Sequence, residues 1–165
     1  MKKVRLRYYK KEDFDFLHEM LSDPETVKFF PMMYTTSKEQ SRLRLETRLW
    51  DEESDYANRY VIQDFFTRKP VGEISGRIAT DKPDVMELAV LVHPKYRRQG
   101  YARAGTWEFM KKVIKENRGI NKFRLEFKNY NEASKALAQD MEFDFSKYTG
   151  KDLEWWEKDV DDIDK

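Results

Sequence analysis

The feature that most limits how this chain folds is an uninterrupted apolar run, Leu88–Val92, in a sequence of which 38% of residues are charged. Five apolar residues in succession leave a strand without a solvent-facing side, so both of its faces must be covered, as in the centre of a sheet. His93-Pro94 ends the run, and a helical pattern begins at Tyr101. The run therefore predicts layers of helix packed around a central strand.

The remaining elements follow from hydrophobic periodicity and from cap residues. Helices are expected at 11–22, from Ser37 onward, at 101–116 and at 131–141, with Ser37 and Asn131 as N-caps. Strands are expected at 4–9, 59–67, 71–80, 85–92, 123–127, 143–145 and 153–156. This order predicts one mixed α/β domain over residues 1–165, with an acidic tail at 159–165 that frays.

Composition excludes several classes of protein. The 11 Phe, 9 Tyr and 4 Trp argue against disorder, and the absence of Cys excludes disulfides and thiolate chemistry. The 32 basic residues nearly balance the 31 acidic ones, so no partner is expected among nucleic acids or membranes. Two isolated His predict no metal site, and the absence of a visible signal peptide favours the cytoplasm.

The segment between the apolar strand and the following helix is basic and short. Lys95, Arg97 and Arg98 precede Gly100, and the helix starts at the next residue. The N–H groups of a first helical turn lack internal partners, and Gly lets an anion approach the backbone closely. Arginine side chains add charge-assisted bonds. The segment therefore predicts a site for a phosphorylated molecule.

Residues alone leave the ligand of this site open. The second Gly and the Lys-Ser/Thr pair of a nucleotide-hydrolase phosphate loop are missing, and one Gly does not make a dinucleotide fingerprint. Arg97-x-x-Gly100-x-Ala102, after Val92-His93-Pro94, does resemble the motif Arg/Gln-x-x-Gly-x-Gly/Ala of the GNAT N-acetyltransferases. Arg124–Phe127 and Asn131–Ser134 resemble a later segment of the same family. The start of the chain is similar to its ribosomal-protein-alanine acetyltransferase branch.

This resemblance implies a fold and a cofactor. The implied fold is a mostly antiparallel sheet of about seven strands, splayed between strands four and five, with about four helices. The implied co-substrate is acetyl-CoA, held by the backbone of Leu91 and Val92 and by the loop and a later helix. The expected cofactor contacts are Leu91, Val92, Arg97, Arg98, Gln99, Gly100, Tyr101, Ala102, Asn131 and Ser134.

Two positions depart from the family pattern. Some members place a Tyr general acid where this chain has Ala138, and many have Gly-Phe where this chain has Glu142-Phe143. The first departure leaves the acid unassigned, so Tyr130 and Tyr101 are the candidates. For the general base, Glu126 best matches the family position and Glu87 is the second choice, with removal of the proton through water as an alternative.

The predicted function is transfer of an acetyl group from acetyl-CoA to a primary amine: a protein N-terminus, a small amine or an amino sugar. The alternative from another class is an acyl-CoA-binding sensor without catalysis, which the missing Tyr keeps open. A nucleic-acid-binding module is a third reading, opposed by the balanced charge. The expected state is a monomer or homodimer.

Overall fold

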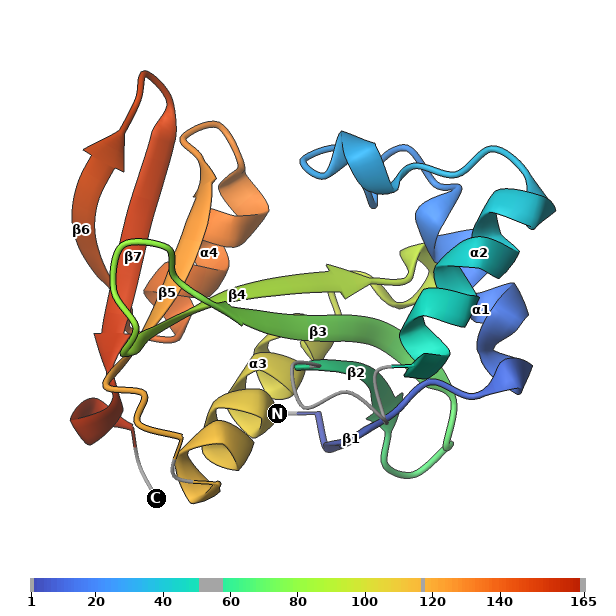
Figure 1. Ribbon diagram of the computed structural model, residues 1–165, viewed down its shortest axis with the longest axis horizontal. Coiled ribbons are helices and arrows are strands. Elements are labelled where there is room, and N and C mark those ends of the chain that lie inside the picture. Colours follow the sequence, from blue (N-terminus) through green and yellow to red (C-terminus); the bar gives the residue numbers. More distant parts are fainter. Residues whose placement is uncertain (1, 51–57, 117, 164–165) are drawn as a thin grey trace. The chain divides into compact units, whose positions relative to one another are not determined.

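The computed structural model describes residues 2–50, 58–116 and 118–163. Its strands are β1 (Val4–Arg7), β2 (Arg59–Asp64), β3 (Pro70–Ile78), β4 (Val85–Val92), β5 (Lys122–Lys128), β6 (Asp144–Thr149) and β7 (Leu153–Asp159). Its α-helices are α1 (Phe14–Leu21), α2 (Lys38–Leu49), α3 (Tyr101–Lys115) and α4 (Glu132–Asp140) (Figure 1). The predicted mixed α/β fold is confirmed, with the boundaries of β4 as expected.

The strands form one seven-stranded sheet in the order β1-β2-β3-β4-β5-β7-β6. The pairs β1–β2, β2–β3, β5–β7 and β6–β7 are antiparallel, whereas β4 and β5 are parallel. The parallel pairing joins Val85–Glu87 to Lys122–Arg124, which are the first three residues of each strand. The splay between these two strands that the family resemblance implies stays a prediction.

The chain consists of two compact units. The first comprises Met1–Ser75 with Val90–Glu108, and the second comprises Gly76–Ala89 with Phe109–Lys165. Each unit has its own core and its own part of the sheet, and each is described separately below.

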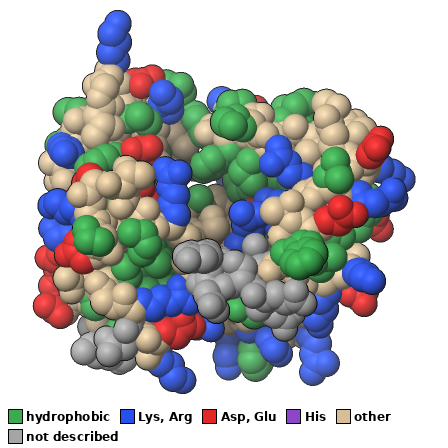
Figure 2. All heavy atoms as spheres, viewed as in Figure 1, with side chains coloured by type: hydrophobic (Ala, Val, Ile, Leu, Met, Phe, Trp, Pro, Cys, Tyr) green, Lys and Arg blue, Asp and Glu red, His purple; other side chains and the backbone are tan. Residues whose placement is uncertain are grey.

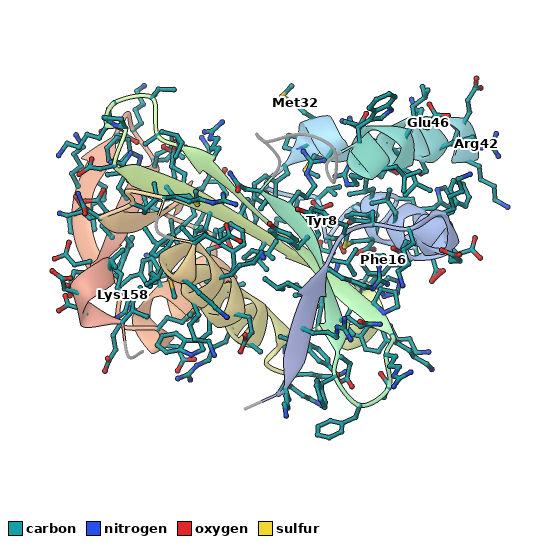
Figure 3. The ribbon with its side chains drawn as sticks, turned by 60° about the horizontal axis from the view of Figure 1, so that its bottom comes forward. Tyr8, Phe16, Met32, Arg42, Glu46 and Lys158 are labelled. Atoms are coloured by element: carbon teal, nitrogen blue, oxygen red, sulfur yellow. The ribbon has the colours of Figure 1, made fainter. Side chains whose placement is uncertain are left out.

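The core of the first unit lies between α1, α2 and the sheet. It consists of the buried residues Tyr9, Phe16, Leu17, Met20, Leu21, Val27, Leu45, Val61 and Leu91. In Figure 3, Phe16 lies on the inner side of α1, whereas Arg42 and Glu46 project outward from α2. Phe14 and His18 lie half-buried at the edge of this core and stack on each other at a centroid distance of 6.0 Å.

The caps of two helices agree with the sequence. Ser37 Oγ accepts a hydrogen bond from the Gln40 N–H at 3.1 Å and caps α2. Asn131 Oδ1 accepts one from the Ser134 N–H at 3.1 Å and caps α4. Each bond satisfies one of the N–H groups that the first helical turn leaves without a partner.

In the second unit, β5, β7 and β6 run side by side with α4 against β5 (Figure 1). Helix α4 ends through Glu142, which has a φ of +59°. This left-handed conformation is the one that Gly adopts most easily at the end of a helix. Glu142 therefore occupies the position where many members of the resembled family have Gly, and it adopts the same backbone conformation.

The end of the chain differs from the expectation of a frayed tail. Asp159 is the last residue of β7, Val160–Asp162 form a 3-10 helix, and Ile163 is buried. The Val160 N–H donates to the Asn121 carbonyl oxygen at 2.9 Å. Residues 159–163 thus pack against the second unit, and the last two residues lie outside the described part of the chain.

Candidate active site

The predicted phosphate-binding segment connects β4 to α3 in the first unit. His93 caps the 3-10 helix Pro94–Tyr96 by accepting the Lys95 N–H at Nδ1. Two residues then adopt left-handed φ values, Arg98 at +58° and Gly100 at +89°. The Ala104 N–H donates to the Gly100 carbonyl oxygen at 3.1 Å, which closes the first turn of α3. The N–H groups before Ala104 therefore lie at the positive end of the helix dipole, where anions bind.

The side chains of this loop point in different directions. The Arg97 guanidinium bonds to Asp23 and to the Thr26 hydroxyl, which follow α1. Burial alone would raise the pKa of Asp23, but the bonds from Thr26 and Arg97 outweigh it and lower that pKa. Arg98 and Gln99 are exposed. Arg97 thus braces the loop through its side chain, and Arg98 is the exposed arginine of the pair.

Tyr101, the first residue of α3, turns its side chain into the protein. Its hydroxyl donates to Asp64 Oδ2 at 2.5 Å, and the ring is buried. Burial and the Asp64 carboxylate raise the pKa of Tyr101 to about 12. The phenol therefore holds its proton tightly, which makes it a poor general acid. Only its backbone faces the loop as a candidate ligand group.

The backbone of β4 at Leu91 lies unusually close to β3. A Cβ atom added to Gly72 would come within 2.4 Å of the Leu91 carbonyl oxygen, so only Gly fits there. Leu91 is buried and Val92 is half-buried. The predicted thioester-binding backbone is thus held in place by the neighbouring strand, and it joins the loop in one continuous segment from Leu91 to Ala102.

The other predicted residues belong to the second unit. Glu87 Oε1 lies 3.5 Å from Arg77 Nε, and its side chain is 11% exposed. Glu126 is exposed and accepts a hydrogen bond from Trp155 Nε1 at 2.5 Å. Glu87 pairs with Arg124, two residues before Glu126, so both carboxylates lie on the same face of the sheet.

The candidates around the start of α4 have mixed exposure. Tyr130 is 58% exposed, whereas Asn131 is 6% exposed and its side chain is occupied by the helix cap. Ser134 is half-buried on the first turn of α4. The structure thus places the acid candidate Tyr130 directly before the capped helix, and the cofactor contacts of Asn131 and Ser134 stay predictions.

Sequence reasoning did not find two buried arginines. In the first unit, Arg48 Nε lies 2.6 Å from Glu73 Oε1, to which the Tyr9 hydroxyl also donates at 2.6 Å. In the second, Arg124 bonds to Asp81 and Glu157 and lies 3.5 Å from the centroid of the Trp155 ring. In each case the sequence shows an arginine at a position of a helix or strand that faces the core. It does not show the partner, because the partner is distant in the sequence.

Two further observations concern charge and hydropathy. Figure 2 shows acidic and basic side chains together on both halves of the visible face. Within the described residues, no helix is long and apolar enough to cross a membrane, and no three metal-ligating side chains gather in a group.

Comparison with known proteins gives a family and a fold. The family described as "Acetyltransferase (GNAT) domain" matches residues 3–144. No curated protein matches the sequence significantly.

Several solved structures share the fold at low sequence identity. The acetyltransferase (GNAT family) from Bacillus anthracis has a TM-score of 0.82 at 17% identity, covering 98% of this chain and 97% of its own. The spermidine N-acetyltransferase from Vibrio cholerae, in complex with CoA and spermine, has a TM-score of 0.78 at 14% identity. The match covers 98% of each chain. The ribosomal L7/L12 alpha-N-protein acetyltransferase RimL, in complex with coenzyme A, has a TM-score of 0.77 at 17% identity. The match covers 98% of this chain and 96% of RimL.

Proposed function

Because the chain belongs to the GNAT acetyltransferase family, we propose that it transfers the acetyl group of acetyl-CoA to a primary amine. The observation that supports this most strongly is the Leu91–Ala102 segment, which combines a fixed strand end, two left-handed residues and a helix N-terminus. Solved proteins of the same fold contain coenzyme A. We propose that Gly100 and the N–H groups of the first turn of α3 bind the pyrophosphate, with the exposed Arg98 adding positive charge.

The reaction is a single displacement at the thioester. The nitrogen of the neutral amine attacks the carbonyl carbon, the C–S bond breaks, and an amide and the thiol of CoA result. One proton leaves the nitrogen and one reaches the sulfur. Backbone N–H groups can stabilise the oxyanion, and alignment of the two reactants lowers the barrier further.

For the general base, we propose Glu87 ahead of Glu126. Trp155 Nε1–H donates to Glu126 at 2.5 Å, so one oxygen of that carboxylate is already engaged. The Glu87 contact to Arg77 is longer, at 3.5 Å, and involves an arginine that is 74% exposed. Water between Glu87 and the amine would serve the same role, and Tyr130 is the candidate donor to the thiolate.

Conservative substitution separates the two carboxylates. Glu87→Gln should lower kcat by about 100-fold or more, because positioned acid–base groups contribute about 10²–10⁴-fold. Glu126→Gln should leave kcat within a few-fold, and Tyr130→Phe should lower kcat because the proposed donor to the thiolate is lost. The measurement is thiol release across pH 6–10. A loss in Glu126→Gln that exceeds that in Glu87→Gln would reverse the assignment.

The cofactor site is tested by a matched pair of glycine substitutions. Gly100 and Gly119 both have positive φ, +89° and +77°, and only Gly100 lies in the loop. Replacing either by Glu should cost similar stability, about 1–2 kcal/mol from the strained backbone. Gly100→Glu should weaken acetyl-CoA binding at least tenfold, since a bond to a charged group is worth about 1.5–3 kcal/mol, whereas Gly119→Glu should not.

Binding is read as thermal stabilisation by acetyl-CoA and catalysis as thiol release with a panel of amines. Absence of stabilisation would refute the proposed function. Stabilisation without thiol release on any amine would support the non-catalytic sensor, which the Ala138 departure keeps as the second candidate.

A further inference from the structure

We propose that Trp155 and Glu126 form a subsite for a second ammonium group on the acceptor, and that Lys147 occupies this subsite when no acceptor is bound. This proposal rests on the proposed function, because it names the class of amine: an aliphatic diamine or longer polyamine. All of its residues lie in the second unit, on the sheet face that carries Glu87.

The Trp155 ring is a fixed platform. Its strand, β7, lies between β5 and β6, and Trp155 pairs directly with Glu126 on β5 and Lys147 on β6. Directly opposed residues share a face, so all three side chains stand on the same side of the sheet. The indole N–H bonds to Glu126 at 2.5 Å, and the Arg124 guanidinium carbon lies 3.5 Å from the ring centroid. Both contacts restrict the ring's rotation.

Arg124 is part of the framework and does not exchange with a ligand. Its side chain is 2% exposed, and it bonds to both oxygens of Asp81 and, through Nε, to Glu157 at 2.8 Å. The geometry points to contacts on opposite ring faces, because Arg124 belongs to β5 and Lys147 to β6, on the two sides of β7. One ring face is thus permanently covered, and the other is left to Lys147.

Lys147 shows what the second ring face binds. Its Nζ atom lies 4.5 Å from the ring centroid, within the range of a cation–π interaction, and the residue is exposed. A flexible, solvated lysine gives up this position at a modest cost in free energy. An alkylammonium group has the same charge and size as the lysine head group, so it fits the space that Lys147 leaves.

The carboxylates around the ring favour a cation there. Glu126, Glu157 and Asp81 carry three negative charges, against one on Arg124 and one on Lys147. When Lys147 leaves, the cluster has two negative charges in excess. An ammonium group that replaces Lys147 returns the cluster to its earlier net charge of about minus one, whereas a neutral group does not.

The other face of the same strands carries aromatic side chains and part of α4. Trp156 contacts Phe127 and Phe145 there, and Lys135 of α4 pairs with Glu154. On the β3–β4 part of this unit, Phe109 of α3 approaches Gly76 and Met86. Both helical segments of the second unit thus pack against the face opposite Trp155, so within this unit the Trp155 face is left to the polar groups.

The spacing relates the subsite to the proposed base. Glu87 on β4 and Trp155 on β7 lie two strand spacings apart and are offset by two residues along the strands, which separates them by about 12 Å. An acceptor whose reacting nitrogen lies near Glu87 therefore reaches Trp155 with a second cation at the far end of an aliphatic chain. A diamine can place one nitrogen at each of these two positions, whereas a monoamine can occupy only one of them.

The first experiment observes the subsite without catalysis. The indole N–H resonance of Trp155, assigned by its absence in Trp155→Phe, is followed by NMR during titration with α,ω-diamines, with butylamine and with sodium chloride at equal ionic strength. The resonance should move with the amines and not with the salt. Lys147→Met should tighten amine binding about three- to fivefold, as expected for removal of a competing cation–π contact. Lys151→Met, an exposed lysine in the β6–β7 turn, is the control and should change nothing.

The second experiment measures acetyl transfer to α,ω-diamines of increasing length and to butylamine. KM should pass through a minimum with chain length, and Lys147→Met should lower KM for the best diamine three- to fivefold with little change for butylamine. Trp155→Leu should raise KM for the best diamine by a similar factor. If the Trp155 resonance ignores amines in both the wild type and Lys147→Met, or if KM is independent of chain length, the subsite is refuted. If the resonance responds but acetyl-CoA neither binds nor reacts, the proposed function fails and the subsite stands.

Discussion

The two units each contain one buried arginine, and the surroundings of the two differ. The Arg48 and Arg124 side chains are both 2% exposed. Arg48 pairs with Glu73, which is 5% exposed, whereas Arg124 pairs with Glu157 and Asp81, which are 16% and 36% exposed. The first cluster is sealed on every side, and the second has water at its outer edge.

This difference separates a structural role from one that is open to ligands. The sealed cluster joins α2 to β3 and holds the Tyr9 hydroxyl, and no solute reaches it. The open cluster fixes the Trp155 ring and leaves its other face to an exchangeable lysine. Of the two clusters, only the one with solvent-exposed carboxylates is accessible to a ligand.

The largest effect is expected from breaking the sealed cluster. Arg48→Met leaves the Glu73 carboxylate buried without its main partner, which should lower the free energy of unfolding by about 3–5 kcal/mol. The double variant Arg48→Met with Glu73→Leu should recover much of this loss, since neither charge then remains. Urea denaturation of the two variants checks this. Equal stability of the single and double variants would contradict a sealed pair.

Breaking the open cluster should cost less. Arg124→Met leaves Asp81 and Glu157 in contact with water, so they regain solvation, and we expect a loss of about 1–2 kcal/mol. The Trp155 indole resonance should also broaden, because one face of the ring loses its support. A loss equal to that of Arg48→Met, in the same denaturation experiment, would show that solvent at the edge makes no difference.

Acid should remove the stability that the sealed cluster contributes. Burial pushes the pKa of Glu73 up, but Arg48 and the other donors outweigh it, so the folded-state pKa lies below the usual 4.5. A lowered pKa gives stability that is present above pH 4.5 and is lost as the pH falls through the folded-state pKa. The wild type should therefore lose more stability between pH 5 and pH 3 than the Arg48→Met, Glu73→Leu double variant. Parallel curves for the two proteins would rule out this contribution.

The smallest effect is expected outside both clusters, at the end of α4. Glu142→Gly removes the cost of a left-handed side-chain-bearing residue and should raise stability by about 0.5–1 kcal/mol. Glu142→Ala keeps that cost and serves as the control. Thermal unfolding distinguishes them, and a Gly variant no more stable than the Ala variant would mean that the backbone there is unstrained.

Several features were determined by sequence alone because their causes are local. The apolar run Leu88–Val92 defined the central strand, Ser37 and Asn131 defined two helix starts, and Gly100 marked the turn before α3. Periodicity, capping and backbone freedom act within a few residues, so they can be read without the fold.

Other features were decided only by the tertiary structure, because they depend on partners distant in sequence. The Arg97 side chain donates to Asp23, and the Tyr101 hydroxyl donates to Asp64. The side chains of these two predicted phosphate contacts are therefore already engaged within the protein. Glu126 is paired with Trp155, which changes it from the first choice of base into part of a proposed amine subsite. The sequence indicates which residues carry charge; the packing of the strands decides which of those charges are already paired and which are left for a ligand.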